Sequence, residues 1–221
     1  MTFLEIQDLV LTWLDDADAG YFTRPQVRRF VNNALRETQK QLIQSGESWY
    51  LKCVQTNTIA NKDAYALPAD FLKLHRLEII TSGDGTQIQD AKAVLLPMTP
   101  MESTSVPTGP GTSSVYYLKK NCLVLKSVPD RSYPIRLLYS YAASDMVIDT
   151  EIPDVPVPYQ EYLAVLATID GFMKDQRDAS QFLAGKKSSY ETLMKQDANN
   201  RNVDFPRSIV RTESEGFEVF F

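Results

Sequence analysis

The chain has 221 residues, 43% of them hydrophobic, which suits one domain with an elaboration or two small domains. Its 23 basic and 28 acidic residues give a net charge of −5, which argues against a broad nucleic-acid-binding face but allows a local basic patch. No apolar run approaches the ~20 residues of a membrane span, and the N-terminus lacks the basic region of a signal peptide, so we expect a product of the cytoplasm with no membrane partner.

Two helices are expected at the start of the chain. Apolar residues in the first, at residues 2–15, form one stripe: Ile6, Leu9, Val10 and Trp13. The second should run from Thr23 to Gly46, because Thr23 can cap it, Pro25 suits its first turn and Gly46 suits its end. Since the link at residues 20–22 is short, the two helices should be antiparallel neighbours.

The long second helix has an apolar and a charged face. The apolar face is Val27, Phe30, Val31, Ala34, Leu35, Thr38 and Leu42. The charged face is either solvated or a contact between subunits, and the residues expected at such a contact are Arg28, Arg29, Arg36, Glu37 and Lys40. A different hypothesis uses the basic residues of helix 24–45 to bind DNA, as a packaging accessory would: Arg24, Arg28, Arg29 and Arg36.

From Trp49 the pattern changes to the alternation of a β-strand. Further strands are expected at residues 74–81, 115–119, 122–126 and 134–142, with a hairpin turn at 82–85, a weaker strand at 86–89 and a short helix or strand near 91–96. Residues 98–114 should form a mobile loop. The two cysteines, Cys53 and Cys122, are expected to be buried free thiols.

The chain then returns to helices, at residues 159–174 and about 178–198, after an acidic loop that is better explained as a solvated connector than as a metal site. The predicted fold class is α+β: a four-helix bundle with an inserted small antiparallel β-domain and an extended C-terminal tail. The predicted divisions are residues 1–50 with 156–198 for the bundle, 51–155 for the β-domain and 199–221 for the tail.

The C-terminal segment, residues 199–221, is rich in aromatic residues without a helical stripe. A disordered tail is usually poor in aromatic residues, so this segment should either pack back on its own domain or dock on another chain, for example as an added strand. The residues expected to dock are Phe205, Arg207, Ile209, Val210, Arg211, Phe217, Phe220 and Phe221.

An enzyme is the least favoured class. The chain has a single histidine, and none of the common nucleotide-binding, hydrolase or zinc-protease motifs occurs in it. Two cysteines and one histidine cannot form an all-Cys/His zinc site. We therefore predict no catalytic residue, no cofactor and no metal.

Several strings, in this order, resemble those of head-to-tail adaptor (connector) proteins of tailed bacteriophages. They are FLEIQDLVLTWL, YFTRPQVRRFVNNALRETQKQL, WYLKC, AYALPADFLKLHRLE, YYLKKNCLVLKSVPD and IPDVPVPYQEYLAVLA. The resemblance covers roughly residues 3–195 and lies in the hydrophobic pattern and the order of the motifs.

The resemblance implies a structural virion protein that forms a ring, commonly of twelve copies, at the portal vertex. In such proteins the helical part builds the ring, a C-terminal extension grips the portal, and the lower face receives tail or nozzle proteins. Double-stranded DNA passes through the ring without sequence-specific contact. By position, the extension in this chain is residues 199–221.

Overall fold

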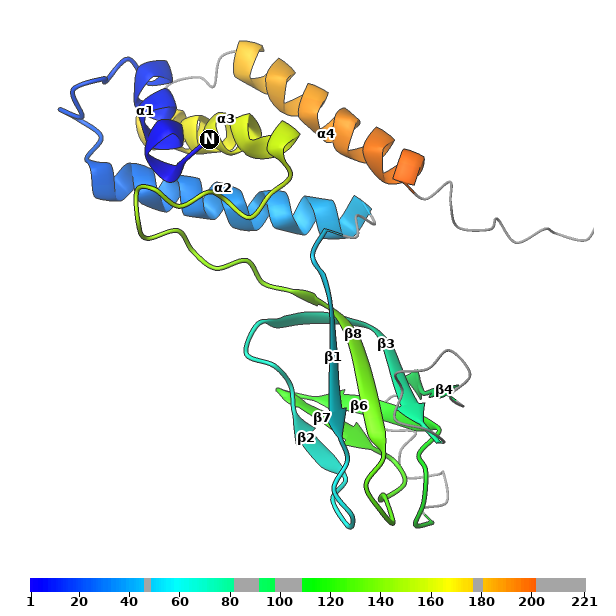
Figure 1. Ribbon diagram of the computed structural model, residues 1–221. Helices are drawn as coiled ribbons and strands as arrows, with labels where there is room; N and C mark the ends of the chain where they lie inside the picture. Colours follow the sequence, from blue (N-terminus) through cyan, green and yellow to red (C-terminus); the bar gives the residue numbers. More distant parts are fainter. Residues whose placement is uncertain (46–48, 82–91, 98–108, 177–180, 202–221) are drawn as a thin grey trace, which may run out of the picture.

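The computed structural model describes residues 1–45, 49–81, 92–97, 109–176 and 181–201. Four helices lie at one end of the molecule and two β-sheets at the other (Figure 1). The helices are α1 (Phe3–Trp13), α2 (Arg24–Ser45), α3 (Gln160–Lys174) and α4 (Gln181–Arg201), and a single 3-10 turn, η2 (Val157–Tyr159), leads into α3. Their positions agree with the helices expected from the apolar spacing.

Local capping explains where α1 begins. The side chain of Thr2 accepts a hydrogen bond from the Glu5 backbone N–H at 3.3 Å, and the Glu5 carboxylate accepts one from the Thr2 N–H at 2.8 Å. This reciprocal pair satisfies two of the backbone donors that a helix start leaves open. Helix α2 begins after Thr23, whose carbonyl accepts the N–H groups of Gln26 and Val27.

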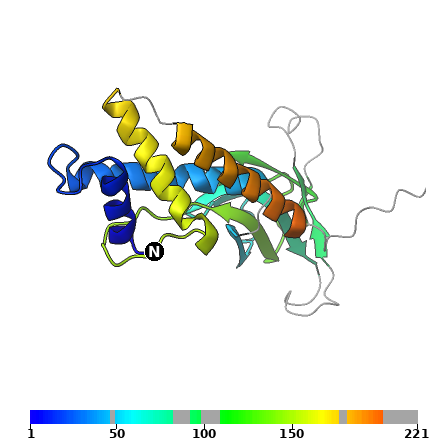
Figure 2. The same cartoon turned by 90° about the horizontal axis from the view of Figure 1, so that it is seen from above.

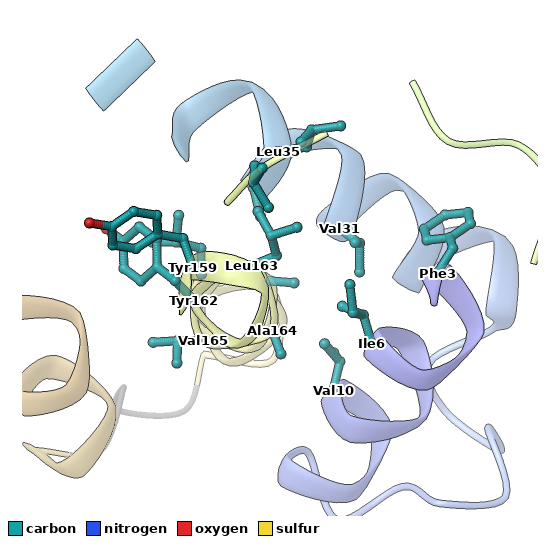
Figure 3. Close-up of a cluster of buried hydrophobic side chains, with 14 of the residues drawn as sticks. Phe3, Ile6, Val10, Val31, Leu35, Tyr159, Tyr162, Leu163, Ala164 and Val165 are labelled. Carbon is teal, nitrogen blue, oxygen red and sulfur yellow. The ribbon is translucent and has the colours of Figure 1, made fainter. Parts of the chain in front are cut away.

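Helix α3 lies at the centre of the helical core. Every residue from Tyr162 to Thr168 is buried, so α3 is apolar around its whole circumference. Figure 3 shows its Leu163 and Ala164 among side chains of α1 and α2, including Ile6 and Val31. A helix that is apolar all round needs neighbours on every side, which makes α3 the element on which the others pack.

The predicted four-helix bundle with a small inserted domain is wrong, although the α+β class is correct. Helix α1 crosses α2 instead of running alongside it, and α3 sits between its neighbours (Figures 1 and 2). Among the described side chains of α4 only Leu183 and Met194 are buried, while Leu193 is 46% exposed, so α4 covers the core without completing a bundle. The reason is that the apolar residues of α4 do not form one continuous stripe.

The β part is also larger than predicted, because it contains two four-stranded sheets. The first has the order β1-β8-β3-β4 and is antiparallel: β1 (Leu51–Asn57), β8 (Pro134–Tyr141), β3 (Phe71–Ile80) and β4 (Lys92–Val94). The second has the order β2-β7-β6-β5: β2 (Ala64–Ala66), β7 (Cys122–Leu125), β6 (Val115–Lys119) and β5 (Leu96–Pro97). Within it β5 pairs with β6 in parallel.

Alternating residues of the two sheets pack against each other to form a second hydrophobic core. In β8 the inward residues are Ile135, Leu137 and Tyr139; residues of β3 lie beside them in the same sheet, and residues of β7 in the second sheet belong to the same core. Tyr141, at the end of β8, packs against both this core and the helical one. The domain boundaries predicted at residues 51 and 155 stay a prediction.

Most predicted strands are present, and the short helix or strand expected near 91–96 corresponds to β4 and the start of β5, but β2 was missed because it is too short to show an alternating pattern. The predicted hairpin turn at residues 82–85, the strand at 86–89 and most of the loop at 98–114 lie outside the described residues. Both cysteines are free thiols, as predicted, but their predicted burial is wrong: Cys53 is exposed and Cys122 half-buried. Cys53 projects from the face of β1 opposite Val54, which is the residue that packs against the core.

No helix within the described parts of the chain combines the length and the hydrophobicity that crossing a membrane requires.

Truncating the centre of the helical core should destabilise the whole helical part. We expect Leu163→Ala to lower the free energy of unfolding by about 2–5 kcal/mol, because it leaves a cavity where α1, α2 and α3 meet. The matched control is Leu193→Ala on α4, a residue that is 46% exposed and should change stability by less than about 1 kcal/mol. Equal losses in chemical denaturation of the two variants would contradict the central position of α3.

Candidate functional site

Residues 142–156, here called the connector, link β8 to α3 and run along α2 (Figure 1). Side chains of α2 supply hydrogen bonds to its backbone. The amide of Asn32 donates to the Met146 carbonyl at 3.0 Å and accepts from the Met146 N–H at 2.9 Å. Gln39 donates to the carbonyl of Tyr141, just before the connector, at 2.7 Å. These contacts fix the register of the connector on the helix.

Two arginines of α2 add ion pairs to the same segment. Arg36 contacts both carboxylate oxygens of Asp145, at 3.1 and 2.7 Å, and Arg28 lies 2.6 Å from the Asp149 carboxylate. Arg28 also donates to the Val147 carbonyl at 3.3 Å. All four charged side chains are 38–53% exposed, so each pair stabilises the fold by at most about 1 kcal/mol.

The five residues predicted at a subunit contact are therefore in different situations. Arg28 and Arg36 hold the connector of their own chain, whereas Arg29, Glu37 and Lys40 are exposed on α2. Glu37 accepts a hydrogen bond from Gln41 at 3.3 Å, one turn further along the same helix. A role of these residues between subunits stays a prediction.

The predicted docking residues of the C-terminal segment lie outside the described residues: Phe205, Arg207, Ile209, Val210, Arg211, Phe217, Phe220 and Phe221.

The alternative hypothesis, DNA binding by the basic face of α2, depends on unpaired positive charge. Arg24 lies 2.6 Å from the Asp8 carboxylate, and Arg28 and Arg36 are paired as described above. Three of the four arginines on which that hypothesis depends thus already have carboxylate partners. Since affinity for DNA grows with the number of phosphates that a protein neutralises, this pairing weakens the hypothesis.

The helical and β parts meet at a polar joint around Asp154 and Asp70. The Asp154 carboxylate accepts hydrogen bonds from Trp49 Nε1 at 3.2 Å and from the Tyr141 hydroxyl at 3.0 Å. The Tyr50 hydroxyl donates to the Asp154 carbonyl, and burial, together with the nearby Asp154 charge, raises the pKa of Tyr50. These contacts attach the end of the connector to the start of β1.

Asp70 makes the second half of this joint. Its carboxylate accepts from Lys52 Nζ at 2.8 Å and from the Tyr139 hydroxyl at 3.0 Å, and the Lys52 contact lowers the pKa of Asp70. The Asp70 carbonyl also accepts the Ala142 N–H at 2.7 Å. Asp70, directly before β3, thus holds Tyr139 of β8 and the first residue of the connector, and Lys52 of β1 fixes the Asp70 carboxylate.

A groove of about 750 Å³ lies between α2 and the start of β3, and it is here called the α2–β3 groove. Its charged residues are Arg36, Glu37, Lys40 and Lys73, and its apolar residues are Ile43, Leu72, Ala142 and Ala143. Three of the five residues predicted at a subunit contact, Arg36, Glu37 and Lys40, thus line this groove. Sequence reasoning missed Ile43 and Leu72, because their place beside α2 depends on how β3 approaches the helix.

The connector also exposes a group of apolar side chains, at residues 147–152, which we call the connector turn. Val147, Ile148 and Ile152 are 68%, 61% and 68% exposed. The Glu151 carboxylate holds the turn by accepting the N–H groups of Val147 at 2.6 Å and Ile148 at 3.0 Å. The sequence predicted a solvated connector here, and the signal for this apolar surface was the presence of three branched apolar residues within six positions of a loop.

The described residues contain no group of three or more His, Cys, Asp or Glu side chains that could hold a metal ion. The acids of the connector instead bind arginines, backbone N–H groups and aromatic hydroxyls, as described above. The one histidine, His75, has its Nε2 at 2.7 Å from the Ser140 Oγ on the neighbouring strand, and burial lowers its pKa.

Asp170 on α3 should make stability depend on pH. Burial raises the pKa of its carboxyl, Glu37 raises it further and Lys187 opposes the shift. A raised folded-state pKa gives stability that is present below the unfolded-state pKa and is lost as pH rises through the folded-state value. We therefore expect Asp170→Asn to raise the melting temperature at pH 7 and to leave it nearly unchanged at pH 3. Equal shifts at the two pH values would contradict this assignment.

The ion pair between Arg36 and Asp145 should couple α2 to the connector measurably. A double-mutant cycle of Arg36→Met and Asp145→Asn should give a coupling energy of about 0.2–1 kcal/mol and faster hydrogen exchange at residues 143–148. The control cycle replaces Arg36→Met by Arg29→Met, at an exposed arginine of the same helix, and should give a coupling near zero. If the control cycle gave the same coupling energy, the coupling would come from the overall positive charge of α2 and not from the contact between Arg36 and Asp145.

Comparison with known proteins identifies the family. No curated protein matches the chain. The family model described as SU10 adaptor protein matches residues 1–211, which include all four helices and both sheets. This match confirms the resemblance to phage adaptor proteins that the order of motifs indicated. The chain belongs to the SU10 adaptor protein family.

Proposed function

We propose that this protein is the head-to-tail adaptor of a tailed bacteriophage, a structural virion protein at the portal vertex. In this proposal, copies of the chain form a ring, commonly of twelve, that joins the portal to the tail or nozzle proteins. The observation that carries the proposal is the family match over residues 1–211. Membership of an adaptor family supports a structural role and partners in the phage head and tail.

The surfaces described above suit a protein that assembles with copies of itself. The exposed apolar connector turn and the α2–β3 groove lie at different places on the same chain. Two different surfaces that meet between neighbouring copies make a heterologous contact, and such a contact closes into a ring when the rotation per copy allows it.

The C-terminal segment, residues 199–221, is proposed to dock on the portal. The family match ends at residue 211, so Phe217, Phe220 and Phe221 lie beyond the part shared with the family. A segment with so many aromatic groups gains free energy when it buries them on a partner. Several such segments, one from each copy in a ring, would act together through their high effective concentration.

DNA is proposed to pass through the ring without sequence-specific contact. The net charge of −5 and the internal pairing of Arg24, Arg28 and Arg36 both favour weak interaction with phosphates. The same observations make the DNA-binding alternative the weaker hypothesis. No described contact favours it over the adaptor.

The proposal is tested by mass measurement of the protein alone and mixed with its portal protein. The full chain should form a multimeric complex with the portal, whereas a chain ending at Arg201, which keeps all of α4, should lose most of its portal binding. A control that exchanges an exposed apolar residue of the β part, Ile59→Ser, should bind like the unchanged protein. Equal portal binding by the shortened and full chains would disprove docking by the C-terminal segment, and no binding by either would disprove the adaptor function.

A further inference from the structure

The apolar side chains of the connector turn are left uncovered by the described residues of the chain. Its three branched side chains are more than 60% exposed, yet Glu151 holds the turn in one conformation. An apolar turn that is ordered in advance loses little conformational entropy when a partner covers it. This combination is typical of a contact surface and unusual for a solvated loop.

The α2–β3 groove has the complementary chemistry. Its floor is apolar, with Ile43, Leu72 and the two alanines 142 and 143, and its volume of about 750 Å³ is of the scale that holds several aliphatic side chains. Three cations and one acid line it, namely Arg36, Lys40, Lys73 and Glu37. Arg36 already pairs with Asp145 of its own chain, which leaves Lys40 and Lys73 as the cations for a partner. The connector turn, residues 147–152, carries two acids, Asp149 and Glu151, and no basic residue. Charge and hydrophobicity therefore match between the turn and the groove.

A chain cannot place its own turn in its own groove. The turn is fixed beside Arg28 by the 2.6 Å contact to Asp149, while Lys40 of the groove lies twelve residues further along the same helix. Twelve residues of α-helix span about 18 Å. Among the described residues, the chain's own connector turn therefore cannot fill the groove, and this turn can enter such a groove only on another molecule.

We propose that the connector turn of one copy, Val147–Ile152, inserts into the α2–β3 groove of the next copy. This inference rests on the proposed function, since it names the contact by which copies of the chain would assemble. The two surfaces differ, so the contact is heterologous and every copy both donates a turn and receives one. Helix α2 holds both surfaces at a fixed separation, which keeps the rotation from one copy to the next constant.

Disulfide trapping tests the proposal in the full chain. The background carries Cys53→Ser and Cys122→Ser, and a pair of cysteines is then added at the turn and the groove by Ile148→Cys and Leu72→Cys, both at exposed positions. A turn of six residues is much smaller than the about 20–30 residues a side of a stable interface, so covalent trapping is preferred to measuring affinity. The protein is oxidised both alone at high concentration and in complex with its portal.

We expect the double variant to give a ladder of dimers, trimers and larger species on a non-reducing gel, at least several-fold above the control. The matched control moves the second cysteine to the β part, with Ile148→Cys and Ile59→Cys, at a residue that is also exposed. Mixing the two single variants, Ile148→Cys and Leu72→Cys, should give dimers and no larger species. Adding Ile152→Asp to the double variant should reduce the ladder, because it places a charge in the apolar contact.

A ladder no stronger than the control in both samples would overturn the proposal. Dimers formed by Ile148→Cys alone would also overturn it, because they would show that two turns meet each other. This result can be told apart from a failure of the adaptor function. If mass measurement finds a multimer on the portal but no ladder forms, the chain still assembles as an adaptor, and the contact between copies must use another surface.

Discussion

Hydrogen bonds from side chains of α2 to the backbone of the connector hold together parts of the chain that are far apart in sequence. The connector follows the last strand of the first sheet and has no sheet partner for its own N–H and carbonyl groups in the described residues. Backbone groups of this kind need partners when they lie against a protein surface. Asn32, Arg28 and, just before the connector, Gln39 supply them. The chain can therefore return to α3 in one defined path.

This path has two consequences for the rest of the molecule. It brings Tyr159 and the buried residues of α3 back to the core that α1 and α2 began, so the central helix arrives after the whole β part. It also fixes the end of the connector at Asp154, where Trp49 and Tyr141 donate to the carboxylate. The β part thus leaves and re-enters the helical part at neighbouring points, and Tyr141 contacts both hydrophobic cores.

The contacts with the connector also explain the charged face of α2. A row of arginines on an exposed helix face is commonly taken as a binding site for an acidic partner, and here the first partners are Asp8, Asp145 and Asp149 of the same chain. Exposed ion pairs of this kind add little stability, so their main effect is on geometry. The connector turn is presented at a fixed place, and its Val147, Ile148 and Ile152 stay exposed.

The sequence by itself determined the elements whose signal is local. The spacing of apolar residues placed α1, α2 and α3, and the alternation after Trp49 and around Leu137 placed the long strands, because helices and strands bury one face at a fixed period. The motif order also pointed to the adaptor family. Short strands such as β2 left no periodic trace and were missed.

Only the tertiary structure decided how these elements meet. The sequence led us to expect a four-helix bundle with a small inserted β-domain. The crossing of α1 over α2, the exposure of Leu193 and the presence of a second sheet show a different arrangement. The pairing of Arg36 with Asp145 joins residues 109 positions apart, and the groove joins α2 to Leu72 of β3. Such contacts depend on the packing of whole elements against one another, and no pattern confined to one stretch of sequence carries that information.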